Sequence, residues 1–227
     1  MKLSIIIPVL NEAFLIERSL QALQPLRQLG HQVIVIDGGS TDATPALAHA
    51  LCDKLLQTAA GRAAQMNLGA AQAEADILLF LHADTTLPAT AEVLLREVMV
   101  DPEIKWGRFD AQINGSRLLR LIALAMNWRS HLTGIATGDQ AIFVRRSVFM
   151  DAGGFAEIPL MEDVEFSKRL RKLAWPRRIS VPVKVSNRRW QAHGIIRTIL
   201  LMWWLRFLFF VGVEPQRLVS MYYKNSR

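Results

Sequence analysis

The chain opens with short apolar runs that each end in polar residues, and this alternation constrains the fold more than any other feature. Residues 3–9 and 33–36 are rich in Ile and Val, as is typical of strands buried on both faces of a parallel sheet. The stretch between them, from residue 12 to about residue 23, is interpreted as a helix. Strand, helix and strand in this order predict a βαβ unit.

The same alternation continues to about residue 100 and then becomes less regular. Helices are expected from Thr44 and over residues 61–73, 116–131 and 161–173, and strands over residues 54–57, 77–81, 106–113 and 140–144. Asn11 is expected to cap the helix that follows it. The predicted fold class is α/β, with a mostly parallel central sheet, helices on both faces and a C-terminal apolar or amphipathic helix.

Cysteine usage and the N-terminal residues indicate the compartment. The single cysteine, Cys52, has no partner for an internal disulfide, so nothing points to an oxidising environment. Pro8 and Asn11 interrupt the first apolar run before any cleavage site, which favours a strand over a signal peptide. We therefore expect a cytoplasmic protein.

Charge is distributed unevenly along the chain. Residues 1–167 hold 13 Lys and Arg against 19 Asp and Glu, whereas residues 168–227 hold 14 against a single acid, Glu214. Between residues 195 and 213 nearly every side chain is apolar, and only Arg197 and Arg206 are charged. The pattern is typical of a helix lying on an anionic membrane surface, peripheral to the inner face of the cell membrane. A helix buried against the sheet or in a homodimer interface explains it equally well.

Polar residues follow three of the expected strands, at residues 8–12, 37–42 and 82–84. Ligands collect at the carboxyl ends of parallel strands, so these segments are candidates for one shared site, although capping or turn formation would explain any one of them alone. The sequence has neither a P-loop nor a dinucleotide-binding glycine motif after the first strand. A bound diphosphate could instead be held by a divalent cation on a carboxylate such as Asp84.

Five motifs occur in order: SIIIPVLNE at residues 4–12, VIDGGSTD at 35–42, GRAAQMN at 61–67, HAD at 82–84 and MED at 161–163. Together they resemble the family 2 inverting glycosyltransferases with the GT-A fold, over roughly residues 3–190. The resemblance implies a nucleotide-sugar-binding catalytic domain over residues 1–190 and a basic, aromatic-rich helical extension over residues 191–227. The extension would pack on the domain, at a membrane surface or in a dimer interface.

Residue by residue, the resemblance implies a donor site and a metal site. The nucleotide-sugar-binding positions are Pro8, Asn11, Glu12, Asp37, Gly38, Arg62, Asn67, His82, Arg189 and Trp190. Asp84 matches the carboxylate that binds Mn²⁺ or Mg²⁺, and His193 is a further candidate ligand or else a surface histidine. His82 stands where the family has the first Asp of an Asp-x-Asp element, which leaves its contact with ribose or metal open.

Asp163, with Glu162 beside it, matches the family's general base, although acids in a first helical turn also stabilise the helix dipole. Asp139 is a candidate acceptor contact or a turn residue. The implied reaction is metal-dependent, inverting transfer from a nucleoside-diphosphate sugar, a UDP-sugar foremost, to a hydroxyl acceptor such as a lipid-linked or cell-envelope glycan. The alternative is a non-catalytic binding protein on a degenerate transferase fold. No nucleic-acid-reading module is present, and the Gly-rich, Arg-containing loop of sugar nucleotidyltransferases is missing.

Overall fold

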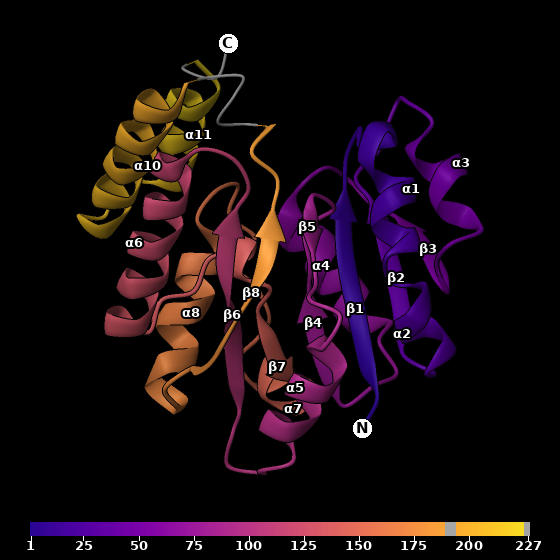
Figure 1. Cartoon of the computed structure of the whole chain (residues 1–227). Helices are drawn as coiled ribbons and strands as arrows, with labels where there is room; N and C mark the ends of the chain where they lie inside the picture. The colour runs from indigo at the N-terminus through magenta and orange to yellow at the C-terminus, as the bar shows by residue number, and fades with distance from the viewer. Residues whose placement is uncertain (189–193, 225–227) are drawn as a thin grey trace.

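The computed structural model describes residues 1–188 and 194–224, and these residues form one eight-stranded sheet with helices around it (Figure 1). The strands lie in the order β3-β2-β1-β4-β7-β6-β8-β5. Their bounds are β1 Leu3–Val9, β2 Gln32–Asp37, β3 Lys54–Gln57, β4 Ile77–Phe80, β5 Thr85–Thr86, β6 Trp106–Ile113, β7 Phe143–Arg145 and β8 Arg177–Val185.

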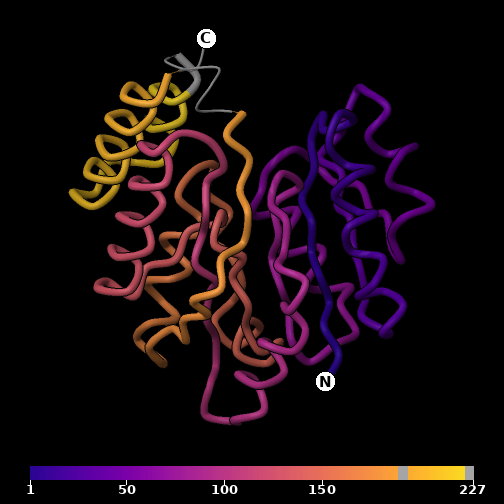
Figure 2. The backbone as a smooth tube through the Cα atoms, in the orientation of Figure 1, coloured from indigo at the N-terminus to yellow at the C-terminus, as the bar shows by residue number. Residues whose placement is uncertain are grey.

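The sheet is mostly parallel, as predicted. Strand β1 pairs in parallel with β2 and β4, β2 pairs in parallel with β3, and β6 pairs in parallel with β8. Strand β7 is antiparallel to both β4 and β6, and the short β5 is antiparallel to β8. The backbone trace shows the N-terminal strands on one side and the later strands on the other, with the C-terminal helices folded back beside α6 (Figure 2).

Helices cover both faces of the sheet, which confirms the α/β prediction. Their bounds are α1 Ala13–Gln21, α2 Gln24–Gln28, α3 Thr44–His49, α4 Arg62–Ala71, α5 Ala91–Met99, α6 Arg117–Thr133, η1 Gly138–Gln140 (a 3₁₀ turn), α7 Arg146–Asp151, α8 Glu162–Leu173, α10 Ile195–Phe210 and α11 Pro215–Lys224. Alternate residues of a strand point to opposite faces, so Ile5 and Ile7 pack with α1, α5 and α6, whereas Ile6 packs with α4 and α8.

The capping role expected of Asn11 is wrong. Helix α1 begins after Glu12, which occupies the N-cap position, and the Glu12 side chain makes no capping hydrogen bond. Asn11 has a left-handed backbone (φ 54°), and its side-chain oxygen accepts a hydrogen bond from the Thr41 amide at 2.9 Å. The Ala13 amide instead donates to Asp42 Oδ2 at 3.1 Å, so the loop after β2 caps α1.

In the second half of the sheet, one predicted strand needs a new start and one strand was missed. Residue 140 belongs to η1, so β7 starts only at Phe143. Strand β8 was not predicted, because its buried positions are irregularly spaced and Pro182 interrupts it. The register of β6 and β8 shifts between Phe109 and Asp110, where the pairing passes from Ile179 to Pro182, so the proline lies at an irregularity that tolerates it.

The C-terminal extension contains two described helices, α10 and α11, where a single apolar helix was expected. Pro215 starts the second helix, consistent with the preference of proline for a first helical turn. Leu205 and Leu218 are fully buried, in a cluster with Ile135, Met161 and Val164 of the sheet domain. The extension therefore packs directly on the domain. Within the described residues no helix is long and apolar enough to cross a membrane.

Candidate active site

The carboxyl ends of β1 and β2 are joined by hydrogen bonds between the loops that follow them. The Asn11 amide donates to Ser40 Oγ at 2.8 Å, and the Glu12 amide donates to Thr44 Oγ1 at 2.8 Å. The Thr41 amide returns a bond to the Asn11 side chain. Two of the three polar segments predicted to share a site are thus held side by side.

Asp37, the last residue of β2, is 2% exposed, and within the described part of the chain only one of its two carboxylate oxygens accepts hydrogen bonds. Its Oδ2 accepts hydrogen bonds from the amides of Gly39 at 3.1 Å and Ser40 at 3.0 Å. Its Oδ1 is buried and has no hydrogen-bond partner among the described residues. A buried acceptor without a donor is costly, so this oxygen is suited to a donor group brought by a ligand.

Helix α4 is fixed against these strand ends by Gln65. The side-chain amide of Gln65 donates to the carbonyls of Val9 at 2.8 Å and Ile36 at 2.7 Å. Gly38 lies against the same amide, because a Cβ there would approach the Gln65 side chain to 3.1 Å. This anchoring places Arg62, the first residue of α4, at the same edge of the sheet.

The third segment, after β4, is joined to η1 and α8. His82 Nδ1 lies 3.3 Å from Asp139 Oδ1, and the Gly138 amide donates to Asp163 Oδ2 at 2.8 Å. A Cβ on Gly138 would lie 2.4 Å from the His82 ring, so only glycine allows the imidazole to approach. Residues 82, 139 and 163, far apart in sequence, therefore form one connected group.

Electrostatic coupling extends this group to Glu162 and Arg62. Burial raises the pKa of Glu162 above its ordinary value, and the charge of Asp163 adds to the shift. Desolvation alone would raise the pKa of Asp139, but His82 and Arg62 lower it to about 2. Desolvation likewise opposes the shift at Arg62, whose pKa is nevertheless raised by the charges of Glu162 and Asp139. The site thus holds several charges that depend on one another.

Backbone strain is concentrated at this edge of the sheet. Among the described residues other than glycine, positive φ angles occur at Asn11 (54°), Ala141 (45°) and Met161 (70°). Asn11 follows β1, Ala141 follows η1, and Met161 immediately precedes Glu162 at the start of α8. Such backbones cost free energy and cluster at functional sites, where the surrounding structure holds them in place.

Asp84 follows His82 by two residues, immediately before β5, and is half-buried. Its backbone carbonyl accepts from the Ser186 amide at 3.1 Å, which ties the segment to the end of β8. No group of three or more His, Cys, Asp or Glu side chains suited to a metal ion occurs within the described residues. The carboxylate oxygens of Asp84 still fit Mg²⁺ or Mn²⁺, because these ions take few protein ligands when substrate phosphates supply the others.

Other predicted residues are less directly placed at this site. Asn67 exchanges two hydrogen bonds, both 2.9 Å, with the backbone of Phe155, so its amide links α4 to the loop before α8. Pro8 lies in β1 beyond the part of the strand that pairs with β4. Arg189, Trp190 and His193 fall outside the described residues.

Three arginines at the site were not among the predicted site residues. Arg188 Nη2 lies 2.9 Å from Glu12 Oε2, so the segment after β8 reaches back to the loop after β1. Desolvation and then the charge of Arg206 lower the pKa of Arg129 in α6 to about 10. The charge of Arg206 in α10 also contributes to the lowered pKa of Asp139. Arg188 directly precedes the predicted residues Arg189 and Trp190, whereas no predicted motif includes Arg129 or Arg206, which only the tertiary fold brings to the site.

The comparisons with known proteins agree with this geometry. A family model described as "Glycosyl transferase family 2" matches residues 4–152. The succinoglycan biosynthesis protein ExoA of Rhizobium meliloti (strain 1021) is 30% identical over 196 residues, which are 75% of this chain and 58% of that protein.

Two solved structures extend the similarity to the fold. The mannosyltransferase PcManGT from Pyrobaculum calidifontis, in complex with GDP-Man and Mn²⁺, is 25% identical with a TM-score of 0.61, covering 81% of this chain and 56% of that chain. TarS (residues 1–349) from S. aureus, in complex with UDP-GlcNAc, is 18% identical with a TM-score of 0.64, covering 82% of this chain and 58% of that chain. The likeness confirms the predicted GT-A fold, although this chain spans less than two thirds of each relative.

Proposed function

The chain belongs to glycosyl transferase family 2, and on that premise we propose that it transfers a sugar, with inversion, from a nucleoside-diphosphate sugar to a hydroxyl acceptor. The observation that carries the proposal is the connected group of His82, Asp139 and Asp163 beside the strand ends that hold Asp37. This arrangement supports a donor site and a carboxylate base that are adjacent on one edge of the sheet.

The nucleotide is proposed to lie over the loops after β1 and β2. The unpartnered Oδ1 of Asp37 can accept a hydrogen bond from a base N–H, such as that of uracil, so we propose a UDP-sugar as the donor. Glu12 and Asn11 line the same edge. Gly38 has no side chain there, so the Gln65 amide can lie close to its backbone. Arg62, at the first turn of α4, supplies positive charge for the diphosphate.

A divalent cation, Mn²⁺ or Mg²⁺, is proposed to be held by Asp84 together with the donor phosphates. When bound, it would neutralise the charge that develops on the departing diphosphate. The related mannosyltransferase structure contains Mn²⁺ with its GDP-Man, which supports a metal of this class. His193 remains a candidate second ligand.

Asp163 is proposed as the general base. The acceptor oxygen attacks the anomeric carbon, its proton passes to the Asp163 carboxylate, and the bond from that carbon to the diphosphate breaks with its electrons on the leaving oxygen. The Gly138 amide holds Asp163 Oδ2 at 2.8 Å, which fixes the carboxylate before the acceptor arrives. Asp139 and Glu162 are proposed to shape the acceptor side, with Arg189 and Trp190 closing the donor side.

The acceptor is proposed to be a lipid-linked or cell-envelope glycan, with the enzyme peripheral to the inner face of the cell membrane. The exposed apolar residues of α10 support this part of the proposal, as does the similarity to a succinoglycan biosynthesis protein.

A thermal-shift screen tests the donor and metal together. UDP-, GDP-, dTDP- and CDP-sugars are each added with and without Mn²⁺, because a ligand that binds only the folded state raises its apparent stability. Stabilisation by a UDP-sugar that requires Mn²⁺ is expected. Stabilisation by none of these ligands would favour a non-catalytic protein on the same fold.

A further inference from the structure

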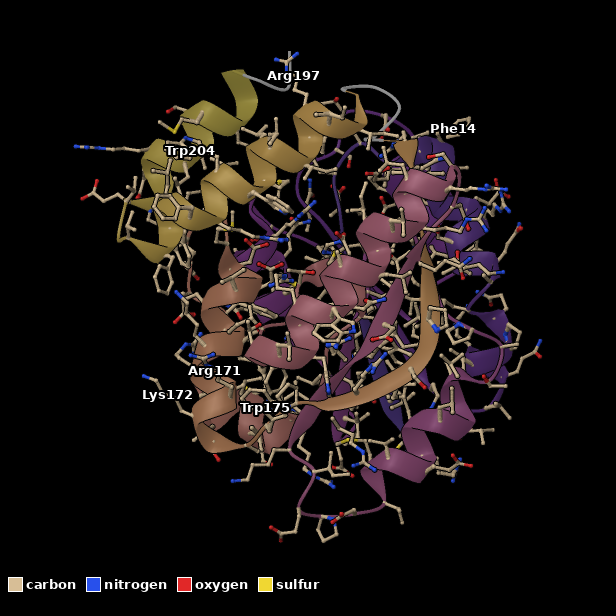
Figure 3. The ribbon with its side chains drawn as sticks, turned by 60° about the vertical axis from the view of Figure 1, so that its left-hand side comes forward. Phe14, Arg171, Lys172, Trp175, Arg197 and Trp204 are labelled. Atoms are coloured by element: carbon tan, nitrogen blue, oxygen red, sulfur yellow. The ribbon has the colours of Figure 1, made fainter. Side chains whose placement is uncertain are left out.

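Helices α6 and α10 lie side by side on one flank of the molecule (Figures 1 and 3), and both carry exposed apolar side chains. On α6 the side chains of Leu118, Leu121, Leu124, Trp128 and Leu132 are between 44% and 67% exposed. They recur at steps of three or four residues, so they form one stripe along the helix. The same helix turns Leu119 and Ala123 into the core, so the stripe is its outer side.

Helix α10 has the same two-sided construction. Its inner side is occupied, because Leu205 is fully buried against the domain and Lys168 of α8 lies 4.8 Å from the Phe209 ring. Its outer side carries Ile196, Leu200, Trp203, Trp204, Phe207 and Phe210, each more than half exposed. We call these outer sides of α6 and α10 the two-helix face. A concentration of large exposed apolar side chains of this kind indicates an interaction surface.

The charges around the two-helix face identify its partner. Helices α6 and α10 contain no Asp or Glu, and their exposed arginines are at positions 117, 120 and 197. Lys168, Arg171 and Lys172 of the neighbouring α8 add to the positive charge, and Figure 3 shows Arg171 and Lys172 on the same side as Trp204. An apolar surface bordered by cations fits lipid tails beneath anionic head groups.

A second copy of the chain fits this surface poorly. A two-fold interface places the same patch against itself, so the arginines of α6 and α10 would meet arginines of the partner. Neither helix has a carboxylate to compensate them, and uncompensated like charges oppose association. Lipid head groups carry the opposite charge and avoid this cost.

We propose that the two-helix face binds an anionic lipid bilayer through the outer side chains of both α6 and α10. Leu205, on the same helix as the exposed Trp203 and Phe207, is buried in one cluster with Met161, the residue before Glu162 of the candidate site. The bilayer therefore lies next to the acceptor side. The acceptor is then a sugar or hydroxyl carried on a membrane lipid, a conclusion that rests on the proposed function.

Vesicle co-sedimentation tests the surface without donor or acceptor. The full chain is mixed with vesicles of phosphatidylcholine alone or phosphatidylcholine with phosphatidylglycerol, at low and high salt. Binding is expected with the anionic vesicles and should weaken with salt. Trp128→Ser with Leu124→Ser on α6, and Trp203→Ser with Phe207→Ser on α10, should each lower the partition coefficient by about tenfold or more, because large apolar side chains lose their burial.

The matched control is Phe14→Ser with Leu29→Ser. Both side chains are well exposed, and Figure 3 shows Phe14 on a different flank from Trp204, so this variant should bind vesicles like the parent. Thermal unfolding and donor-induced stabilisation of every variant show whether the fold and the nucleotide site are intact. If the parent protein binds no donor, that result counts against the proposed function. It leaves the vesicle-binding measurement, and the inference that rests on it, unaffected.

A measurement on the unmodified chain supplements the variants. Lipids brominated along their tails should quench tryptophan fluorescence in anionic vesicles, because three tryptophans of the two-helix face would enter the bilayer. No binding to anionic vesicles would overturn the inference, and so would equal binding by the face variants and the parent. The inference would also be overturned if the parent and the control variant formed a concentration-dependent dimer and the face variants did not. That result would assign the two-helix face to self-association.

Discussion

Replacing Asp163 with Asn should abolish sugar transfer while leaving the protein folded and able to bind its donor. The carboxylate accepts two hydrogen bonds, from the Gly138 amide at 2.8 Å and from the Val164 amide at 2.7 Å. Asparagine has one side-chain oxygen and keeps one of these bonds. Losing a hydrogen bond to a charged group costs about 1.5–3 kcal/mol, so a modest fall in Tm is expected.

The loss of activity should be far larger than this loss of stability. A positioned general base contributes roughly 10²–10⁴-fold to the rate, which is about 3–5 kcal/mol of activation free energy. A domain with an unfolding free energy of about 5–15 kcal/mol stays almost entirely folded after losing about 2 kcal/mol. Unfolding therefore cannot account for a hundredfold decrease in rate.

The assay follows labelled sugar from the donor found in the thermal-shift screen into a cell-envelope lipid extract. Glu165→Gln is the matched control, because Glu165 lies in the same first turn of α8 and pairs with Arg169 away from His82. If helix-dipole stabilisation were the role of Asp163, the two variants would behave alike. Full transfer activity in Asp163→Asn would refute the assignment of the base.

Three further predictions concern neighbouring residues. Asp84→Ala should remove the Mn²⁺-dependent part of the donor-induced rise in Tm, whereas Asp76→Ala, at the opposite end of β4, should retain it. Gly138→Ala should lower Tm and donor binding, because the new Cβ would lie 2.4 Å from the His82 ring, and His82→Ala in the same chain should restore the stability. Glu162→Gln should raise Tm at neutral pH. The pKa of its carboxyl is raised in the folded state, so the ionised form costs stability above that pKa. The gain should therefore fade as the pH falls from the raised pKa towards the ordinary carboxyl pKa, and be absent below it.

The sequence predicted the half of the fold that repeats a simple pattern. Strands β1, β2 and β4 are short, mostly apolar and followed by polar residues, so local composition is enough to place them. Strand β8 could not be found this way, because its residues alternate irregularly around Pro182 and its pairing shifts register opposite Asp110. Residue 140 was misplaced because Thr137 and Gln140 form a capping box that makes a 3₁₀ turn before β7.

The candidate site shows a similar division. Motifs that follow strands placed Asn11, Asp37, His82 and Asp84 at one edge, since parallel strands end together. Other contacts at the site join segments that are far apart in the sequence. The ion pair of Arg188 with Glu12 joins residues 176 positions apart, and the coupling of Arg206 to Asp139 depends on how α10 packs. Such contacts are decided by tertiary structure alone.

His82 stands where the Asp-x-Asp pattern has its first Asp, and in the structure its imidazole lies beside Asp139. An imidazole at position 82 removes one negative charge from the strand end, but the Asp139 carboxylate lies 3.3 Å away and His82 and Arg62 hold its pKa at about 2. A carboxylate, that of Asp139, is therefore present at this point of the site. It comes from η1 and not from the segment after β4. Gly138 makes the exchange sterically feasible, because any side chain there would collide with the imidazole. The imidazole at residue 82 and the glycine at residue 138 are thus sterically linked, and their close approach brings the Asp139 carboxylate beside the imidazole.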